Sequence, residues 1–169
     1  EVIERERGAI GEVKAAADIV IDTTGLNVHQ LKSQLSSLFG TEDIMDSLQV
    51  SVMSFGFKHG VPIDVDMILD VRFLPNPHWD ENLRPLSGLD QPVKDYVLNS
   101  PLASDFSERV NSLLELILPA YVQEGRSYLT IGIGCTGGRH RSVALAGHIA
   151  ERIAEMGYKL RVTHRDISL

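Results

Sequence analysis

The chain has 169 residues, of which 43% are hydrophobic and 23% are charged, and its formal net charge is −7. These values are ordinary for a globular protein of about one domain, and they exclude a collagen-like repeat, a disordered acidic tail and a disulfide-rich scaffold. The only cysteine, Cys135, has no partner for an intramolecular disulfide, which fits a reducing cytoplasm, where we expect the protein to reside. No apolar run approaches the ~20 residues that a membrane-spanning helix needs.

The first forty residues indicate a separate segment. Residues 1–16 have a helical pattern, Asp18–Asp22 is a β-branched run typical of a short buried strand, and residues 27–38 place apolar side chains on one helical face. The residues after this helix contain stop and turn signals, so we expect a domain boundary between residues 40 and 44. Because no Met begins the chain, we interpret the sequence as a piece of a longer protein.

The second block, residues 44–169, alternates strands and helices. Its strands are expected over 48–55, 67–73, 128–133 and 159–163, and its helices over 90–99, 104–123 and 141–156. This alternation predicts an α/β domain with a mainly parallel sheet flanked by helices. Residues 74–89 form a long loop with three prolines, and loops of this length inside compact domains are commonly functional.

Helical periodicity predicts which side chains of two helices enter the core. The expected core positions are Phe106, Val110, Leu113, Leu114, Ile117 and Leu118 in one helix, and Val143, Ala146, Ile149, Ala150 and Ile153 in the other.

Positive charge gathers near the end of the chain. Residues 126–169 hold seven Lys or Arg and three Asp or Glu, a net charge of +4 that leaves −11 on the remainder. This asymmetry favours a local anion site, although a solvated surface with uneven charge would give the same count.

The most informative stretch is a glycine-rich turn, Ile131-Gly-Ile-Gly-Cys-Thr-Gly-Gly-Arg-His-Arg-Ser142. It leads from a predicted strand into a helix N-terminus, where free N–H groups and the helix dipole attract anions. Gly137 and Gly138 can adopt positive φ angles, which would let a phosphate approach the backbone. The other candidate groups for a phosphate or carboxylate are Thr136, Ser142, Arg139 and Arg141.

Two other patterns overlap this turn. Gly132, Gly134 and Gly137 match the dinucleotide-binding fingerprint. The fingerprint also requires a following strand and an acidic residue about 20 positions further on, and too little chain follows for both. Cys135 and Arg141 have the Cys-x5-Arg spacing of protein tyrosine phosphatases, in which a thiolate attacks phosphorus. In that hypothesis Asp80 is the general acid, although Gly134 stands where a histidine usually precedes the cysteine. The alternative is an inert buried cysteine.

Three longer motifs are similar to the RapZ/YvcJ family of nucleotide-binding proteins and RNase adapters. They are Ser54-Phe-Gly-Phe-Lys-His-Gly60, Asp70-Val-Arg-Phe-Leu-Pro-Asn-Pro-His-Trp79 and Gly134-Cys-Thr-Gly-Gly-Arg-His-Arg-Ser-Val143. The resemblance implies that residues 44–169 form a C-terminal domain with a phosphofructokinase-like fold. It also implies that residues 1–40 end an N-terminal P-loop domain whose ATP- or GTP-binding motifs lie upstream, so no cofactor is expected in this chain.

The resemblance further implies a ligand, either glucosamine 6-phosphate or UDP-N-acetylglucosamine. By motif position, the resemblance implies that the ligand is bound by Asp70, His78, Thr136, Gly137 and Arg141. Further candidates for binding it are Gly138, Arg139, His140, Ser142, Arg72, Asn76 and Arg84. We expect His140, between two arginines, to be neutral. No histidine pair has metal-ligand spacing, so we predict no metal.

The resemblance implies homodimers and, in some members, a regulatory RNA or protein partner. RNA-binding members end in a basic cluster, whereas this chain ends in Thr163–Leu169 with Asp166 among them. Because RNA affinity depends on neutralising phosphates and on stacking aromatics, and no exposed aromatic platform is evident, the sequence favours a ligand-sensing domain. A cysteine phosphatase and an RNA adapter remain the alternatives.

Overall fold

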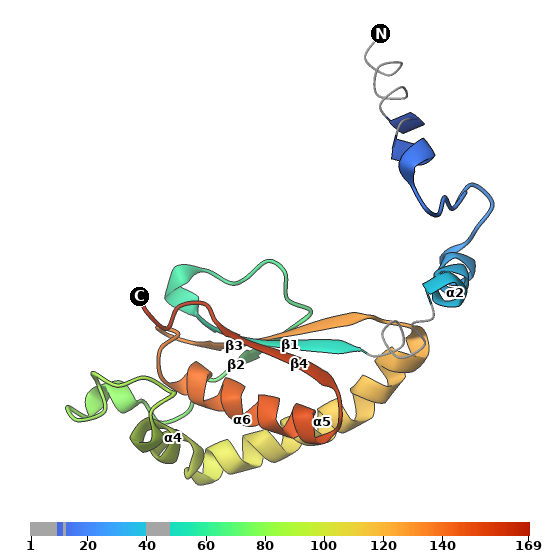
Figure 1. Cartoon of the computed structure of the whole chain (residues 1–169). Helices are drawn as coiled ribbons and strands as arrows, with labels where there is room; N and C mark the ends of the chain where they lie inside the picture. Colours follow the sequence, from blue (N-terminus) through green and yellow to red (C-terminus); the bar gives the residue numbers. More distant parts are fainter. Residues whose placement is uncertain (1–9, 12, 40–47) are drawn as a thin grey trace. The chain divides into compact units, whose positions relative to one another are not determined.

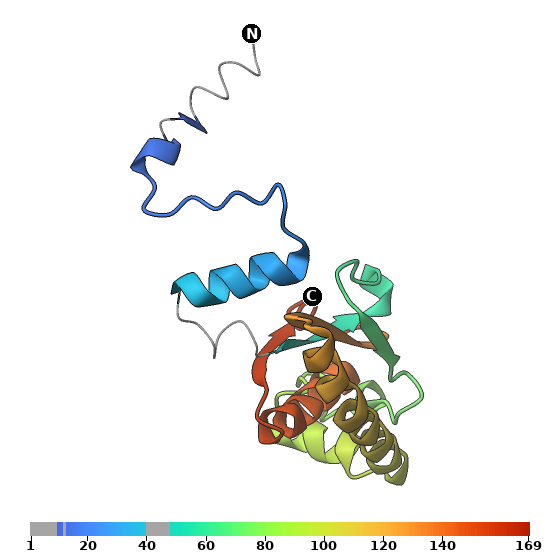
Figure 2. The same cartoon turned by 90° about the vertical axis from the view of Figure 1, so that its right-hand side faces the viewer.

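A computed structural model describes residues 10–11, 13–39 and 48–169, and the chain divides into two compact units, residues 1–42 and 43–169. In the first unit, helix α2 spans Val28–Phe39, close to the predicted range (Figure 2). The predicted strand at Asp18–Asp22 is wrong: these residues are irregular, and Val20 is 53% exposed. A β-branched run forms a strand only beside a pairing partner, and the described part of this unit contains none. The expected boundary at residues 40–44 lies outside the described residues.

The second unit is built on a four-stranded, entirely parallel sheet (Figure 1). This confirms the predicted α/β fold class. In spatial order the strands are β2 (Met67–Asp70), β3 (Tyr128–Cys135), β1 (Gln49–Gly56) and β4 (Lys159–His164). Strand β2 is shorter than predicted because the Asp70 carboxylate accepts the N–H of Arg72 at 3.0 Å and turns the chain out of the sheet.

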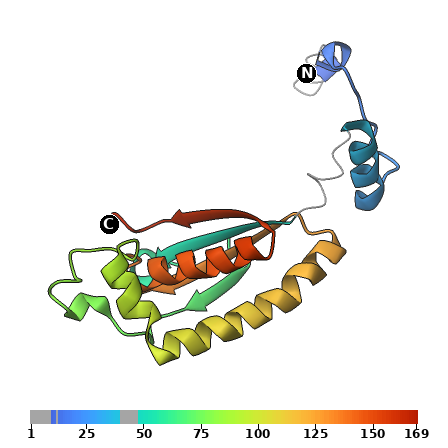
Figure 3. The same ribbon diagram turned by 60° about the horizontal axis from the view of Figure 1, so that its bottom comes forward.

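Three helices pack on one face of this sheet (Figures 1 and 3). They are α4 (Gln91–Leu98), α5 (Pro101–Glu124) and α6 (Arg141–Glu155), and the short 3-10 helices are η1 (Phe57–His59) and η2 (Pro77–Trp79). Helix α5 begins earlier than predicted because Ser100 caps it, accepting the N–H of Ala103 at 3.2 Å. Helix α6 lies directly against β1, β3 and β4, so its N-terminus is fixed relative to the strand ends. No helix in the described part of the chain is long and apolar enough to cross a membrane.

The core lies between α6 and the sheet. All five α6 positions predicted to be in the core are buried. In α5 the prediction for Leu113 is wrong, because this side chain is 41% exposed. The buried stripe of α5 is Ala103, Ser107, Val110, Leu114 and Leu118, a phase that turns Leu113 toward solvent.

Polar contacts fasten the end of β4 to the end of β1. The His164 ring Nδ1 lies 2.9 Å from the hydroxyl of buried Ser54. The carboxylate of Asp166, which is 2% exposed, accepts the N–H of Gly56 at 2.7 Å and two bonds from Arg165. Burial alone would raise the pKa of Asp166, but the Arg165 and Gly56 hydrogen bonds outweigh it and lower that pKa.

A close backbone approach at Gly88 predicts a large stability loss on substitution. A Cβ atom there would lie 2.5 Å from the Ala144 amide nitrogen, at the start of α6. We expect Gly88→Ala to lower the free energy of unfolding by about 1–3 kcal/mol through overpacking. Gly147 lies within α6, and a Cβ added there would meet open space. Gly147→Ala should therefore raise the free energy of unfolding by roughly 0.5–1 kcal/mol. Urea unfolding of both variants measures the difference, and equal effects would refute the packing argument.

The partly buried imidazole of His164 makes stability depend on pH. Burial lowers its pKa in the folded chain below the ordinary histidine value of about 6.5, so between the two values the unfolded chain binds more protons. The folded state should therefore be most stable above pH ~6.5 and lose stability as the pH falls through that value. Urea unfolding at several pH values should show a smaller loss for His164→Asn. His59→Asn, at an exposed position, should follow the native curve, and an identical curve for His164→Asn would contradict the assignment.

Candidate functional site

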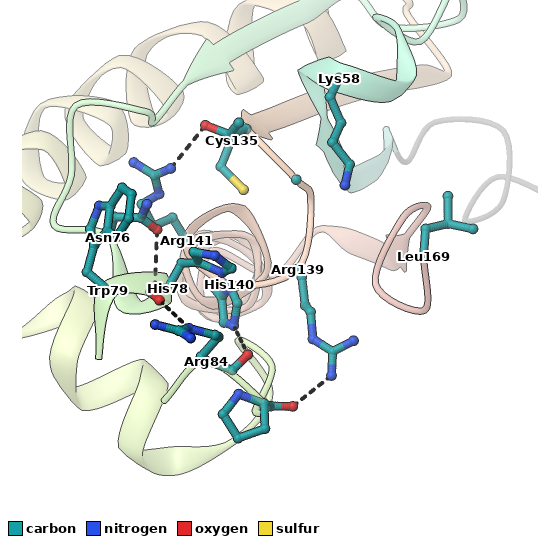
Figure 4. A pocket seen from close by; sticks show the side chains of 13 residues that line it. Lys58, Asn76, His78, Trp79, Arg84, Cys135, Arg139, His140, Arg141 and Leu169 are labelled. Atoms are coloured by element: carbon teal, nitrogen blue, oxygen red, sulfur yellow. Dashed lines mark hydrogen bonds between the residues drawn. The ribbon is translucent and has the colours of Figure 1, made fainter. Parts of the chain in front are cut away.

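A cavity of about 500 Å³ opens at the carboxyl ends of the parallel strands (Figure 4). This edge is where ligands bind in open α/β sheets. Segments that follow all four strands contribute to it, because a parallel register brings their ends together. The lining residues are Lys58, Asn76, His78, Trp79, Arg84, Pro85, Cys135, Thr136, Gly137, Arg139, His140, Arg141 and Leu169.

The glycine-rich turn forms the floor of the cavity. It connects β3 to α6, whose N-cap residue His140 makes no side-chain capping bond, so no side chain at the cap competes with an anion for the N–H groups of the first turn. Gly138 has a positive φ, +79°, and a Cβ there would lie 2.7 Å from the Gly56 nitrogen. Gly137 does not have a positive φ, so one left-handed residue completes the turn.

Cys135 lies in the turn as a buried hydrogen-bonding group. Its Sγ accepts the N–H of Gly138 at 3.2 Å and lies 3.1 Å from the Ser142 hydroxyl. Gly134 cannot be replaced by the histidine of tyrosine phosphatases, because a Cβ there would lie 2.5 Å from the Phe57 ring. Asp80 is not among the lining residues, and its carboxylate accepts the N–H of Asn82 at 2.8 Å. The structure therefore brings Cys135 and Ser142 together but not the acid of the phosphatase hypothesis.

Arg141 is the most deeply buried charge of the site, at 5% exposure. Its guanidinium donates to the carbonyls of Arg72 and Leu74 and, at 3.2 Å, to the Thr136 hydroxyl. It thus links the glycine-rich turn to the start of the long loop. All of these acceptors are neutral. The charge of Arg141 also helps to lower the pKa of Asp70, so a carboxylate outside the lining offsets part of this charge.

Arg139, Arg84 and His140 hold the long loop against the turn. Arg139 donates to the carbonyls of Pro85 and Leu86, at 2.8 and 3.1 Å, and Arg84 donates to that of His78 at 2.9 Å. The His140 ring nitrogen Nε2 lies 3.3 Å from the Arg84 carbonyl. Burial is the main cause that lowers the pKa of His140, with a smaller contribution from Arg139. The direction expected from the sequence is confirmed, but the leading cause is burial rather than the flanking arginines.

The lining carries a strong excess of positive charge. It includes Lys58, Arg84, Arg139 and Arg141 but no Asp or Glu side chain. Among the described residues, the ion pairs of the chain involve other arginines, and none reaches these four cations. The same part of the chain contains no cluster of three or more His, Cys, Asp or Glu side chains suited to a metal ion. The cavity lining is therefore positively charged.

Sequence reasoning missed four lining residues, Lys58, Trp79, Pro85 and Leu169. Lys58 follows Gly56, which pairs with Cys135 in the β1–β3 register, so a correct strand alignment would have placed it beside the turn. Trp79 is 78% exposed, which corrects the expectation that the chain has no exposed aromatic platform. Its position next to His78, a predicted ligand contact in the long loop, was the signal in the sequence that could have placed Trp79 in the lining.

Asp70 and Arg72 are not brought to the cavity lining. Their side chains pair with each other at 2.6 Å, and this hydrogen bond is the main cause that lowers the pKa of Asp70. Arg72 also lies over the Phe57 ring, 4.2 Å from its centre. The negative charge of the Asp70 carboxylate is therefore already compensated by Arg72. Gly138 and Ser142 also lie outside the lining, whereas Asn76, His78, Arg84, Thr136 and Gly137 are part of it.

Comparisons with known proteins identify the family of this chain. Residues 48–168 match the RapZ C-terminal domain. A nucleotide-binding protein of Nocardioides sp. is 51% identical over 163 residues, which are 96% of this chain and 54% of that protein. One from Desulforudis audaxviator is 44% identical over 167 residues, 99% of this chain and 57% of that protein. The chain thus spans a little over half the length of these relatives. It belongs to the RapZ family of nucleotide-binding proteins, and residues 48–168 form its C-terminal domain.

Proposed function

We propose that this domain is a sensor that binds a phosphorylated amino sugar, glucosamine 6-phosphate or UDP-N-acetylglucosamine, at the turn between β3 and α6. The observation that carries the proposal is the cavity lining, with four cationic side chains and no carboxylate side chain. The chain has a net charge of −7, yet four cations gather in this one cavity, which gives the cavity a focused positive potential. The charges of Arg141 and Arg139 also help to lower the pKa values of Asp70 and Asp90, which lie outside the lining, and a phosphate would add negative charge on the cavity side.

The phosphate is assigned to the floor of the cavity. There the first N–H groups of α6 and the exposed hydroxyl of Thr136 are available as donors. Arg139 and Lys58 add charge beside the turn (Figure 4). Hydrogen bonds to charged groups contribute about 1.5–3 kcal/mol each.

The sugar is assigned to the part of the cavity lined by the long loop. Asn76 and His78 offer polar groups there, and the volume of about 500 Å³ lies in the range of small-molecule sites. In this proposal, ligand binding changes how the domain interacts with a partner, which the family resemblance suggests is a protein or an RNA. The protein would act as a homodimer in the cytoplasm. We assign ATP or GTP binding to the P-loop domain that the resemblance places before residue 40.

Catalysis of phosphate ester hydrolysis is less well supported than binding. The guanidinium that would hold the transferring phosphoryl group is directed to the carbonyls of Arg72 and Leu74. No Asp or Glu side chain lines the cavity to protonate a leaving group.

Removing one pocket cation should weaken the ligand without unfolding the domain. Lys58 is exposed and makes none of the ion pairs found among the described residues, so Lys58→Ala should lower affinity for both sugars about tenfold in calorimetry. Arg109→Ala serves as the matched control, because Arg109 pairs with Asp105 on α5, outside the cavity. Absence of binding heat for both sugars, or equal affinity in the Lys58 variant, would contradict the proposal.

The role of the cysteine is tested separately. We expect the chain to show no turnover of an aryl phosphate, and Cys135→Ser to keep sugar affinity within about threefold, since a hydroxyl can also accept the Gly138 N–H. A phosphatase assay combined with calorimetry checks both. Turnover that disappears in Cys135→Ser would replace the sensor with an enzyme.

A further inference from the structure

Helices α5 and α6 lie side by side (Figures 1 and 3), and their side chains form most of the lining of a second cavity, of about 340 Å³. This α5–α6 cavity shares no lining residue with the cavity at the strand ends. Its nearer residue on α6, His148, comes about two turns after Arg141, roughly 10 Å along the helix axis. The two cavities are therefore separate sites.

The α5–α6 cavity is lined by a polar stripe on each helix. The polar side chains stand at spacings of three or four residues, so they share one face of their helix. They are Ser104, Ser107, Glu108 and Asn111 of α5 and His148 and Arg152 of α6. Leu98 is the one apolar side chain of the lining. Helix faces that meet inside a domain are normally apolar, and this lining suits a polar ligand.

Two groups of the α5 stripe are buried without a hydrogen-bond partner. The Asn111 Oδ1 atom is buried and accepts no hydrogen bond in the part of the chain that the structure describes. Ser107 is 4% exposed. Its hydroxyl makes none of the hydrogen bonds found among the described residues, whereas the Ser112 hydroxyl donates to the Glu108 carbonyl at 3.0 Å. A buried acceptor without a donor costs free energy, and a ligand in the cavity would supply the donor.

The charges of the lining favour a cation. Glu108 takes part in none of the ion pairs found among the described residues. Arg152 is the one Lys or Arg of the lining, and its guanidinium pairs with Glu155. The described residues contain no group of three or more His, Cys, Asp or Glu side chains suited to a metal ion, which favours an organic cation.

From these observations we propose that the α5–α6 cavity binds a protonated primary amine, carried by a small molecule or by a lysine side chain. An ammonium group has three N–H donors, which match the Glu108 carboxylate, Asn111 Oδ1 and the Ser107 hydroxyl. Glu108 and Asn111 are three residues apart on α5, so their Cβ atoms lie about 5–6 Å apart, a span that one ammonium group bridges. The charge-assisted bond to Glu108 supplies most of the affinity. This site does not depend on the proposed sugar-phosphate site.

A nuclear magnetic resonance titration of the full chain with n-butylammonium tests the site. We expect saturable shifts of the Asn111 side-chain amide signals and of the backbone N–H signals of Ser107 and His148. Tetramethylammonium, which has the same charge but no N–H donor, should give no saturable shift there. Glu108→Gln should weaken n-butylammonium binding about tenfold. Glu115→Gln is the matched control, at an exposed position of α5 outside the lining, and should leave the affinity unchanged.

A second variant keeps the test independent of folding. Asn111→Leu removes the unpartnered oxygen at similar volume, so it should abolish saturable binding and raise the urea midpoint of the unliganded chain. A lower midpoint together with native affinity for n-butylammonium would show that Asn111 has a structural role and would refute the site.

Two further probes identify the source of the amine. Putrescine represents a free small amine, and Nα-acetyl-lysine methylamide represents a lysine of a partner protein, so tighter binding of one probe identifies that source. Equal shifts with tetramethylammonium, or native affinity in Glu108→Gln, would overturn the proposal. Absence of saturable shifts with all three amines would also overturn it, and the sugar-phosphate site would stand.

Discussion

The buried guanidinium of Arg141 is the interaction on which the site depends. At 5% exposure it donates to two backbone carbonyls and the Thr136 hydroxyl, and no carboxylate of the described residues pairs with it. These bonds hold the start of the long loop against the glycine-rich turn. They pair three of its five N–H groups with neutral acceptors, and part of its charge is offset by Asp70, whose pKa it helps to lower. In the proposed function a bound anion offsets the rest.

The parallel sheet explains how distant segments reach that position. Because β1, β3 and β4 run in register, the ends of all three strands meet at one edge, with Gly56 opposite Cys135 and Ser54 beside both Ile133 and His164. Helix α6 starts from the same edge and points its N–H groups toward it. The position of the cavity is thus a consequence of topology, and in the proposed function the lining side chains select the ligand.

Much of this arrangement follows from local sequence rules. Hydrophobic periodicity located α6 and its core face, and alternation of strands and helices gave the parallel sheet. The turn with Cys135 and Arg141 was predicted as an anion site from its glycines and charges. The sequence could not show that Asp70 is neutralised by Arg72, because pairing depends on where β2 leaves the sheet. It also could not place Lys58 beside the turn, since that requires the strand register. The prediction of a strand at Asp18–Asp22 was wrong for a related reason, because strand propensity does not show whether a pairing partner is present.

A crystal structure of the chain grown with saturating inorganic phosphate would test the central claim most directly. The account predicts a phosphate bound at the start of α6, within hydrogen-bond distance of the Thr136 hydroxyl and of backbone N–H groups of the turn. An empty turn at saturating phosphate, with the Arg141 bonds to Arg72 and Leu74 intact, would show that the neutral acceptors suffice for this charge and would contradict the account.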